Sequence, residues 1–257
     1  IGTLRQYGFE YIKMDYNGSI GIGCDGAESP GEGLRQNMEA SAAFVDKIGR
    51  EVPGIVIENC ASGGHKLEPL MMSKCSMASF SDAHECEEIP IIAANLHRTI
   101  LPCQSQIWCV IREDDSLKRI AYSIAATFLG RMCISGDVTG LSDEQWRLIE
   151  AGMAFYRQIA PIIKDGYTTF YGEIGASYRH LAGWQAILRE GAQGQAYLAL
   201  HTFHGGHEQI RVELPERYCV TGWYSDSEPA FEVEGKTLFF HIKEDSRAVA
   251  LRLEKQE

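Results

Sequence analysis

The sequence predicts an α/β protein, in which part of a TIM (β/α)8 barrel over residues 1–165 is followed by an antiparallel β-sandwich domain over residues 166–257. Strand-like and helix-like segments alternate in the first part, which is typical of a parallel sheet with helical crossovers. Short strand-like segments separated by turn signals fill the second part and indicate antiparallel pairing. About five strand–helix units precede the boundary, whereas a closed barrel needs eight, so we expect the C-terminal portion of a barrel.

Each element of the first part has its own signal. A helix is predicted over 33–50, where apolar residues recur at helical spacing, and another begins at Ser142, which forms a capping box with Gln145. A further helix follows residue 116, with an apolar stripe. Strands are expected over 7–15, 54–60, 75–82, 106–111 and 131–137.

The second part has a different sequence pattern, because its predicted strands are short and closely spaced. Turn signals such as Gly191–Gly194 and Glu234–Lys236 separate them. Strands are expected over 178–190, 195–203, 209–214, 230–234, 237–242 and 248–253.

Composition excludes several classes of protein. The chain has 24 Lys and Arg against 35 Asp and Glu, a net charge of −11, which excludes a strongly basic nucleic-acid binder. No apolar run approaches the roughly 18 residues of a membrane span. The eight cysteines form no C-x-x-C pair, so we expect reduced thiols in a cytoplasmic protein. The chain begins at Ile1 without a Met, and with the low strand count this leads us to expect upstream barrel units.

Polar residues follow the predicted strands where each strand ends: Asp15, Cys60, Asp82 and Asp137. A TIM barrel builds its active site from residues at these carboxyl ends. Asp137 either binds substrate or caps the following turn, and the sequence leaves both open.

The first strand places Tyr11, Lys13 and Asp15 on one face, because strand residues two apart share a face. Lys13 favours the ionised form of Asp15, and a fixed carboxylate beside a cation suits a nucleophile. A structural ion pair at the barrel rim is the alternative. Glu58 and Cys60 share a face of the next strand. Carboxylates at two strand ends of one barrel suggest glycoside hydrolysis by a nucleophile and a proton donor.

Three segments resemble motifs of the α-galactosidases of glycoside hydrolase family 36. Tyr11–Asn17 (YIKMDYN) is similar to their Ile-Lys-Trp-Asp-x-Asn nucleophile strand. Glu58–Gly64 (ENCASGG) resembles their Glu-x-Cys-x-Ser-Gly-Gly loop, and Phe80–Asp82 (FSD) resembles the end of their Trp-x-Ser-Asp segment. The three segments occur in family order, and the resemblance covers nearly all of the chain.

The resemblance implies roles residue by residue. Asp15 matches the catalytic nucleophile and Asp82 the general acid/base of a retaining enzyme that releases terminal α-linked galactose from sugars such as melibiose and raffinose. Substrate contacts are expected from Lys13, Asn17, Cys60, Gly63, Ser81 and His84. Cys60 is expected to be a wall of the pocket and no nucleophile. The resemblance implies no cofactor and no metal, and a homo-oligomer is possible.

Several departures from the family pattern leave the substrate open. Met14 replaces the usual Trp, His65 follows the two glycines, and Ala83–Glu85 follows Asp82. Alternatives are an α-N-acetylgalactosaminidase, a galactosyltransferase of the raffinose-synthase type, and a carbohydrate-binding pseudoenzyme. The tandem aspartates of the family would lie upstream of Ile1, so we expect residues 1–257 alone to be inactive. His201, His204 and His207 resemble a metal cluster, but strand alternation points the first two to opposite faces.

Overall fold

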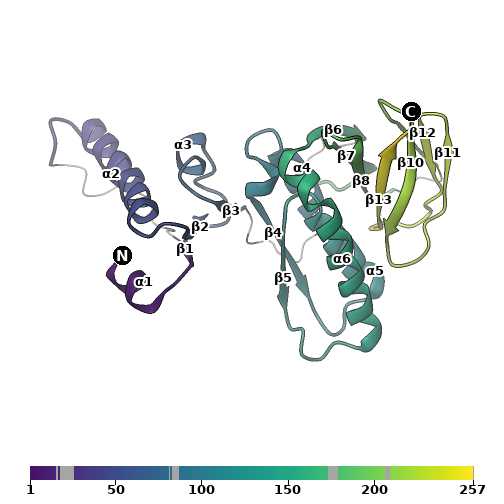
Figure 1. Cartoon of the computed structure of the whole chain (residues 1–257), viewed down its shortest axis with the longest axis horizontal. Helices are drawn as coiled ribbons and strands as arrows, with labels where there is room; N and C mark the ends of the chain where they lie inside the picture. The colour runs from purple at the N-terminus through teal and green to yellow at the C-terminus, as the bar shows by residue number, and fades with distance from the viewer. Residues whose placement is uncertain are drawn as a thin grey trace. The chain divides into compact units, whose positions relative to one another are not determined.

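The computed structural model describes residues 1–15, 17, 26–80, 82, 87–172, 179–205 and 209–256. The chain forms two compact units, Ile1–Asp82 and Ala83–Glu257, and each is described by itself (Figure 1). Among the described residues, no helix is both long and apolar enough to cross a membrane. The domain boundary expected at residues 165–166 is a different division and stays a prediction.

The first unit contains three parallel strands in the order β1-β2-β3. Its elements are α1 (Gly2–Tyr7), β1 (Tyr11–Asp15), α2 (Pro30–Glu51), β2 (Val56–Cys60), α3 (Pro69–Met72) and β3 (Met77–Ser79). Helix α2 begins where Ser29 accepts a hydrogen bond from the backbone N–H of Glu32, with Pro30 in the first turn. The prediction of this helix and of the strand after it is confirmed.

The strand predicted over 7–15 is shorter than expected. Residues 2–7 form α1, and Gly8 ends this helix in the left-handed conformation with φ 66°. The chain therefore becomes extended only at Tyr11. The third strand was also predicted too long, since β3 ends at Ser79 and not at Asp82.

Helix α2 packs on one face of the β1–β2 pair. Val45 and Ile48 of α2 share a buried hydrophobic cluster with Ile57 of β2, and Ile12 and Met14 of β1 pack against that cluster. Since side chains alternate along a strand, Lys13 and Asp15 point to the opposite face of the sheet. Helix α2 therefore does not cover the face that carries Lys13 and Asp15, which is the face of the candidate site.

The second unit begins with helices and a parallel strand pair, β4 with β5. Ser142 and Gln145 form the predicted capping box at the start of the last helix, with both hydrogen bonds present. Figure 1 shows α5 running beside these strands, and α6 packs against α5. The elements are α4 (Ile89–Leu96), η1 (Pro102–Gln104), β4 (Ser105–Ile111), α5 (Leu117–Thr127), β5 (Arg131–Gly136) and α6 (Asp143–Asp165).

The remainder of the second unit is antiparallel, as expected. One sheet has the order β10-β13-β8-β7-β6 and a smaller one has the order β11-β12-β9. One hydrophobic cluster includes residues of both sheets, such as Leu198 and Leu251 from the larger and Val212 and Phe240 from the smaller. The strands are β6 (Tyr167–Gly172), β7 (Trp184–Glu190), β8 (Gln195–Thr202), β9 (Ile210–Glu213), β10 (Tyr218–Tyr224), β11 (Phe231–Glu234), β12 (Thr237–Phe240) and β13 (Ala248–Lys255).

Candidate active site

The candidate site lies at the carboxyl ends of β1 and β2. Lys13 is the register partner of Glu58, and Asp15 is the register partner of Cys60. These four side chains occupy the sheet face opposite helix α2, because the residues between them pack toward that helix. Asp15 is exposed, whereas Cys60 is only 3% exposed. A solvent-accessible carboxylate therefore lies next to a buried thiol.

Glu58 links the three strands of the first unit. Its side chain is 2% exposed. It accepts hydrogen bonds from the hydroxyl groups of Tyr11 on β1 and Ser79 on β3. The ammonium group of Lys13 lies 3.4 Å from Glu58 Oε1. Lys13 therefore does form an ion pair on this face of the sheet, and its partner is Glu58.

Burial changes the acidity of two groups on this face. Desolvation raises the pKa of Glu58 above its usual value, and the hydrogen bond from Ser79 opposes that rise. Desolvation also raises the pKa of the Cys60 thiol, opposed by a hydrogen bond from the backbone N–H of Gly63 and by the charge of Lys13. A thiol kept protonated is a poor nucleophile, which agrees with a wall role for Cys60.

The loop after β2 has an unusual backbone. Ser62, Gly63 and Gly64 all have positive φ angles of 46°, 65° and 132°. The side-chain carbonyl of Asn17 accepts a hydrogen bond of 2.8 Å from the backbone N–H of Ser62 and so ties this loop to the end of β1. A Cβ atom on Gly64 would lie 2.9 Å from the carbonyl oxygen of Phe80, so the loop also approaches the segment after β3.

Asp82 lies in the same compact unit, three residues beyond the end of β3, and is exposed. The residue before it in the described chain, Phe80, is buried. The predicted contact residues Ser81 and His84 lie outside the described residues. Of the predicted site residues, the structure brings Lys13, Asn17, Asp15, Cys60 and Gly63 onto two neighbouring strand ends.

Asp137 belongs to the second unit and follows β5 directly. Its carboxylate accepts a hydrogen bond of 2.8 Å from the hydroxyl group of Thr139. This contact favours the turn-capping alternative over substrate binding.

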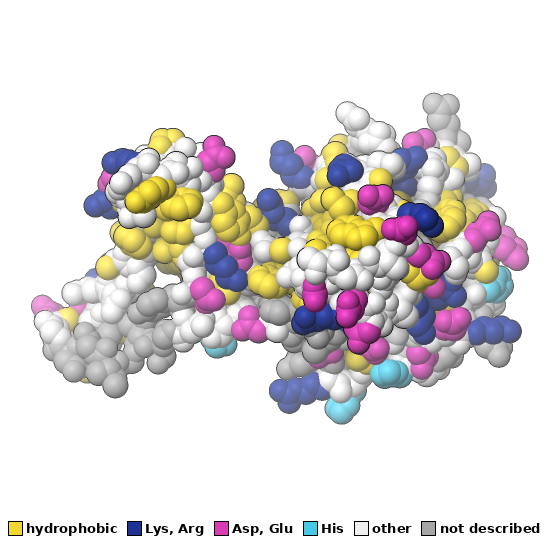
Figure 2. Space-filling view, turned by 90° about the horizontal axis from the view of Figure 1, so that it is seen from below, with side chains coloured by type: hydrophobic (Ala, Val, Ile, Leu, Met, Phe, Trp, Pro, Cys, Tyr) yellow, Lys and Arg dark blue, Asp and Glu magenta, His cyan; other side chains and the backbone are white. Residues whose placement is uncertain are grey.

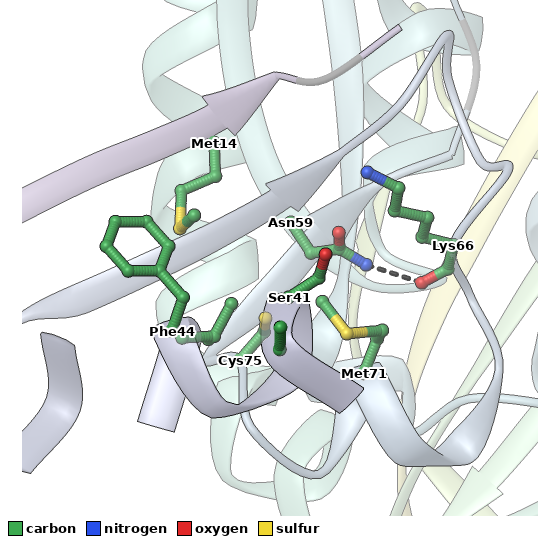
Figure 3. Close-up of a pocket in the computed structure, with 9 residues that line it drawn as sticks. Met14, Ser41, Phe44, Asn59, Lys66, Met71 and Cys75 are labelled. Atoms are coloured by element: carbon green, nitrogen blue, oxygen red, sulfur yellow. Dashed lines mark hydrogen bonds between the residues drawn. The ribbon is translucent and has the colours of Figure 1, made fainter. Parts of the chain in front are cut away.

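A cavity of about 410 Å³ lies on the other face of the sheet in the first unit (Figure 3). Met14 and Asn59 line it. Each lies between two strand residues that point toward the candidate site, so its own side chain points to the opposite face of the sheet. In Figure 3 the side chain of Asn59 reaches toward Lys66, whose carbonyl oxygen accepts a hydrogen bond of 2.5 Å from Asn59 Nδ2. The cavity is therefore separate from the catalytic candidates. Its other lining residues include Ser41, Phe44, Met71 and Cys75.

The residues of the histidine motif lie in different environments, but not through strand alternation, because β8 ends at Thr202 and His204 lies beyond it. His201 is fully buried in β8, whereas His204 is exposed and lies 3.8 Å from Glu87 and 3.7 Å from Asp245. In the described part of the chain, no group of three or more His, Cys, Asp or Glu side chains could hold a metal ion.

Sequence reasoning missed the central place of Glu58. It placed this residue on the correct face but gave it no partner. Ser79 was missed because only the pairing of β2 with β3 brings it to Glu58. The two-residue strand period that selects Lys13 and Asp15 was the available signal for Glu58.

Comparisons with known proteins support the fold. No family model matches the sequence. No curated protein matches it by sequence either. Among solved structures, an α-galactosidase AgaA variant of glycoside hydrolase family 36 from Geobacillus stearothermophilus, in complex with 1-deoxygalactonojirimycin, has a TM-score of 0.77 at 16% identity, covering 99% of this chain and 37% of that chain.

Two further structures give the same result. The galactosidase domain of the α-galactosidase–sucrose kinase AgaSK has a TM-score of 0.76 at 14% identity, covering 99% of this chain and 36% of that chain. The α-galactosidase from Lactobacillus brevis has a TM-score of 0.74 at 16% identity, covering 100% of this chain and 37% of that chain. The chain thus spans little more than a third of the structures it matches, and at this identity the likeness concerns the fold.

Proposed function

We propose that this chain carries the two catalytic carboxylates of a retaining glycoside hydrolase that releases terminal α-linked galactose from oligosaccharides such as melibiose and raffinose. One observation carries the proposal: Asp15 lies exposed at the carboxyl end of a parallel strand, in register with Cys60 and on the same face as Lys13. This is the place where a (β/α)8 barrel collects its catalytic residues.

The fold supports the choice of sugar. The structures similar to this chain are α-galactosidases of family 36, and related structures of AgaA variants contain raffinose and stachyose. The motif residues that this chain shares with that family fall on the strand ends and on the loop after β2.

The proposed reaction is a double displacement. Asp15 attacks the anomeric carbon while Asp82 gives its proton to the leaving oxygen, so a covalent galactosyl ester forms on Asp15 and the glycosidic bond breaks. Asp82, now ionised, takes a proton from water, which attacks the ester and releases galactose with retained configuration. The two carboxyl groups of such a pair stand roughly 5–5.5 Å apart. Lys13, Asn17, Cys60 and Gly63 are proposed to contact the sugar.

We further propose that the parallel strands are part of a (β/α)8 barrel and that the antiparallel sheets form a sandwich behind it. Large apolar side chains are exposed on the first unit, and Figure 2 shows hydrophobic side chains gathered on its surface. Further barrel elements would cover such a face. The exposed side chains are Tyr7, Phe9, Tyr11, Leu34, Met38, Phe44 and Leu70.

A substrate panel tests the function. The gene product that carries this chain is assayed with p-nitrophenyl α-galactoside, p-nitrophenyl α-N-acetylgalactosaminide and raffinose, with the product's anomer followed by NMR. We expect hydrolysis of the galactosides with initial release of α-galactose. Preference for the N-acetylated sugar, transfer to a sugar acceptor, or no turnover of any substrate contradicts the proposal.

A further inference from the structure

Glu58 has the features of a residue that acts through a neighbour. A carboxylate removed from water is costly unless charged or polar groups compensate it. Glu58 is 2% exposed in the middle strand of the β1-β2-β3 group. Hydrogen bonds from both adjacent strands, donated by the hydroxyl groups of Tyr11 and Ser79, offset the cost of burying this carboxylate.

These contacts fix the direction of the carboxylate. Tyr11 donates to Oε2 and Ser79 donates to Oε1, so both oxygens are held. Lys13 Nζ lies 3.4 Å from Oε1, and the Lys13 side chain is 32% exposed. A lysine side chain has a flexible four-carbon stem, so a fixed anion at its tip limits where the ammonium group can lie.

The charges on this face act together on one buried group, the Cys60 thiol. Asp15 is two residues from Lys13 on the same strand face. The charges of Lys13, Asp15 and Glu58 all influence the acidity of the Cys60 thiol, the register partner of Asp15. One cation and two carboxylates therefore surround the thiol on the face that carries the exposed Asp15.

We infer that Glu58 is a positioning residue, which holds the Lys13 ammonium group on the face of the candidate site for contact with the sugar. This inference rests on the proposed function. Without the negative charge of Glu58, Lys13 loses the anion that lies 3.4 Å from its ammonium group, so the sugar binds less tightly.

The test compares Glu58→Gln, Lys13→Gln and the double variant in the gene product that carries the chain. The readout is affinity for 1-deoxygalactonojirimycin by calorimetry. We expect Glu58→Gln to weaken binding about tenfold, the effect of losing one well-placed charged contact. In the Lys13→Gln background, Glu58→Gln should have no further effect on affinity.

Ser79→Ala is the matched control, because it removes one hydrogen bond to Glu58 and keeps the ion pair. Its affinity for 1-deoxygalactonojirimycin should stay closer to that of the unaltered protein than the affinity of Glu58→Gln does. If Glu58→Gln melts below the assay temperature, Glu58→Asp replaces it, with the charge kept and moved by one methylene. Equal losses of affinity in both Lys13 backgrounds, or unchanged affinity in Glu58→Gln, overturn the inference and assign Glu58 a purely structural role.

A further readout separates this inference from the proposed function. The pH dependence of Cys60 alkylation requires no turnover. Loss of the Glu58 charge should lower the pKa of Cys60 and speed alkylation, and loss of the Lys13 charge should slow it. If the protein hydrolyses no galactoside but these opposite shifts appear, the proposed function fails while the charge coupling stands. If it hydrolyses galactosides and the shifts are absent, the inference fails alone.

Discussion

Asp15 and Cys60 are register partners on neighbouring parallel strands, so the candidate nucleophile and the buried thiol share one edge of the sheet. The thiol stays protonated because burial raises its pKa. In the proposed reaction, attack on the anomeric carbon therefore belongs to the exposed carboxylate and not to the sulfur.

Asp15→Asn should abolish galactoside hydrolysis in the gene product that carries this chain. The amide cannot form the glycosyl ester, so a loss of at least about 1,000-fold in kcat is expected. Affinity for 1-deoxygalactonojirimycin, measured by calorimetry, serves as the control that the site is still folded. Retained turnover in this variant contradicts the assignment of Asp15.

Asp82→Asn should show a dependence on the leaving group. Proton donation matters most when the departing alcohol is a poor leaving group, so a loss of about 100- to 10,000-fold in kcat is expected with raffinose. A 2,4-dinitrophenyl galactoside needs no proton, and the first step should proceed and build up the covalent intermediate. Intact-mass spectrometry detects that intermediate. Equal losses with both substrates would assign the acid/base to another residue.

Cys60 should resist alkylation at neutral pH. Its thiol is buried and its pKa is raised, so little thiolate forms. Cys219 is less buried and provides an internal comparison. Peptide mapping after iodoacetamide treatment at pH 7 should find Cys219 modified before Cys60. Modification of Cys60 first would indicate an activated cysteine.

His201 should make the protein less stable in mild acid. Burial lowers the pKa of its ring from 6.5 to about 3. Since the unfolded state binds the proton more tightly, stability is full above pH 6.5 and falls as the pH drops toward 3. At pH 5 this one group should cost about 2 kcal/mol.

His201→Phe provides the corresponding control. Phe keeps the edge-on contact with the Tyr122 ring, whose centroid lies 5.1 Å away, and carries no titrating group. Urea unfolding should show the variant as stable as the parent or about 1 kcal/mol more stable at pH 7, with a weaker loss at pH 5. An unchanged pH dependence would place the effect on other groups, of which His97, with a pKa lowered to about 4, is the next candidate.

Gly64→Ala should destabilise the loop after β2. The residue has φ 132°, and its added Cβ would lie 2.9 Å from the Phe80 carbonyl oxygen. We expect a loss of about 2–4 kcal/mol in unfolding free energy. Gly54→Ala is the matched control, because Gly54 has φ 84° and no atom near the added methyl. Equal losses in the two variants would show that the close approach to Phe80 is not what requires a glycine.

Local signals were sufficient to predict much of this fold. The β-branched run before Cys60, the periodicity of α2 and the capping box at Ser142 each depend on neighbouring residues, and each prediction is confirmed. The left-handed Gly8 that ends α1 was not recognised as a helix end. β10 was missed, and its pairing is interrupted by an irregularity between Val220 and Gly222.

The candidate site was predictable only in part. Strand alternation and the motif resemblance selected Lys13, Asp15 and Cys60, which do meet at neighbouring strand ends. The contacts of Glu58 join residues 21 and 47 positions apart in the sequence, and such partners are fixed by sheet pairing alone. Parallel strands carry no hairpin signal that would fix this register in advance.

The tie between Asn17 and Ser62 spans 45 residues of sequence. The chain between these two residues, including α2, forms a loop whose ends must come together before the nucleophile strand and the glycine loop can meet. Such non-local closure carries an entropic cost before any contact compensates it, and it slows folding. The recognition surface should therefore be among the last parts of the first unit to mature, and a sugar mimic present during refolding should increase the yield of competent protein.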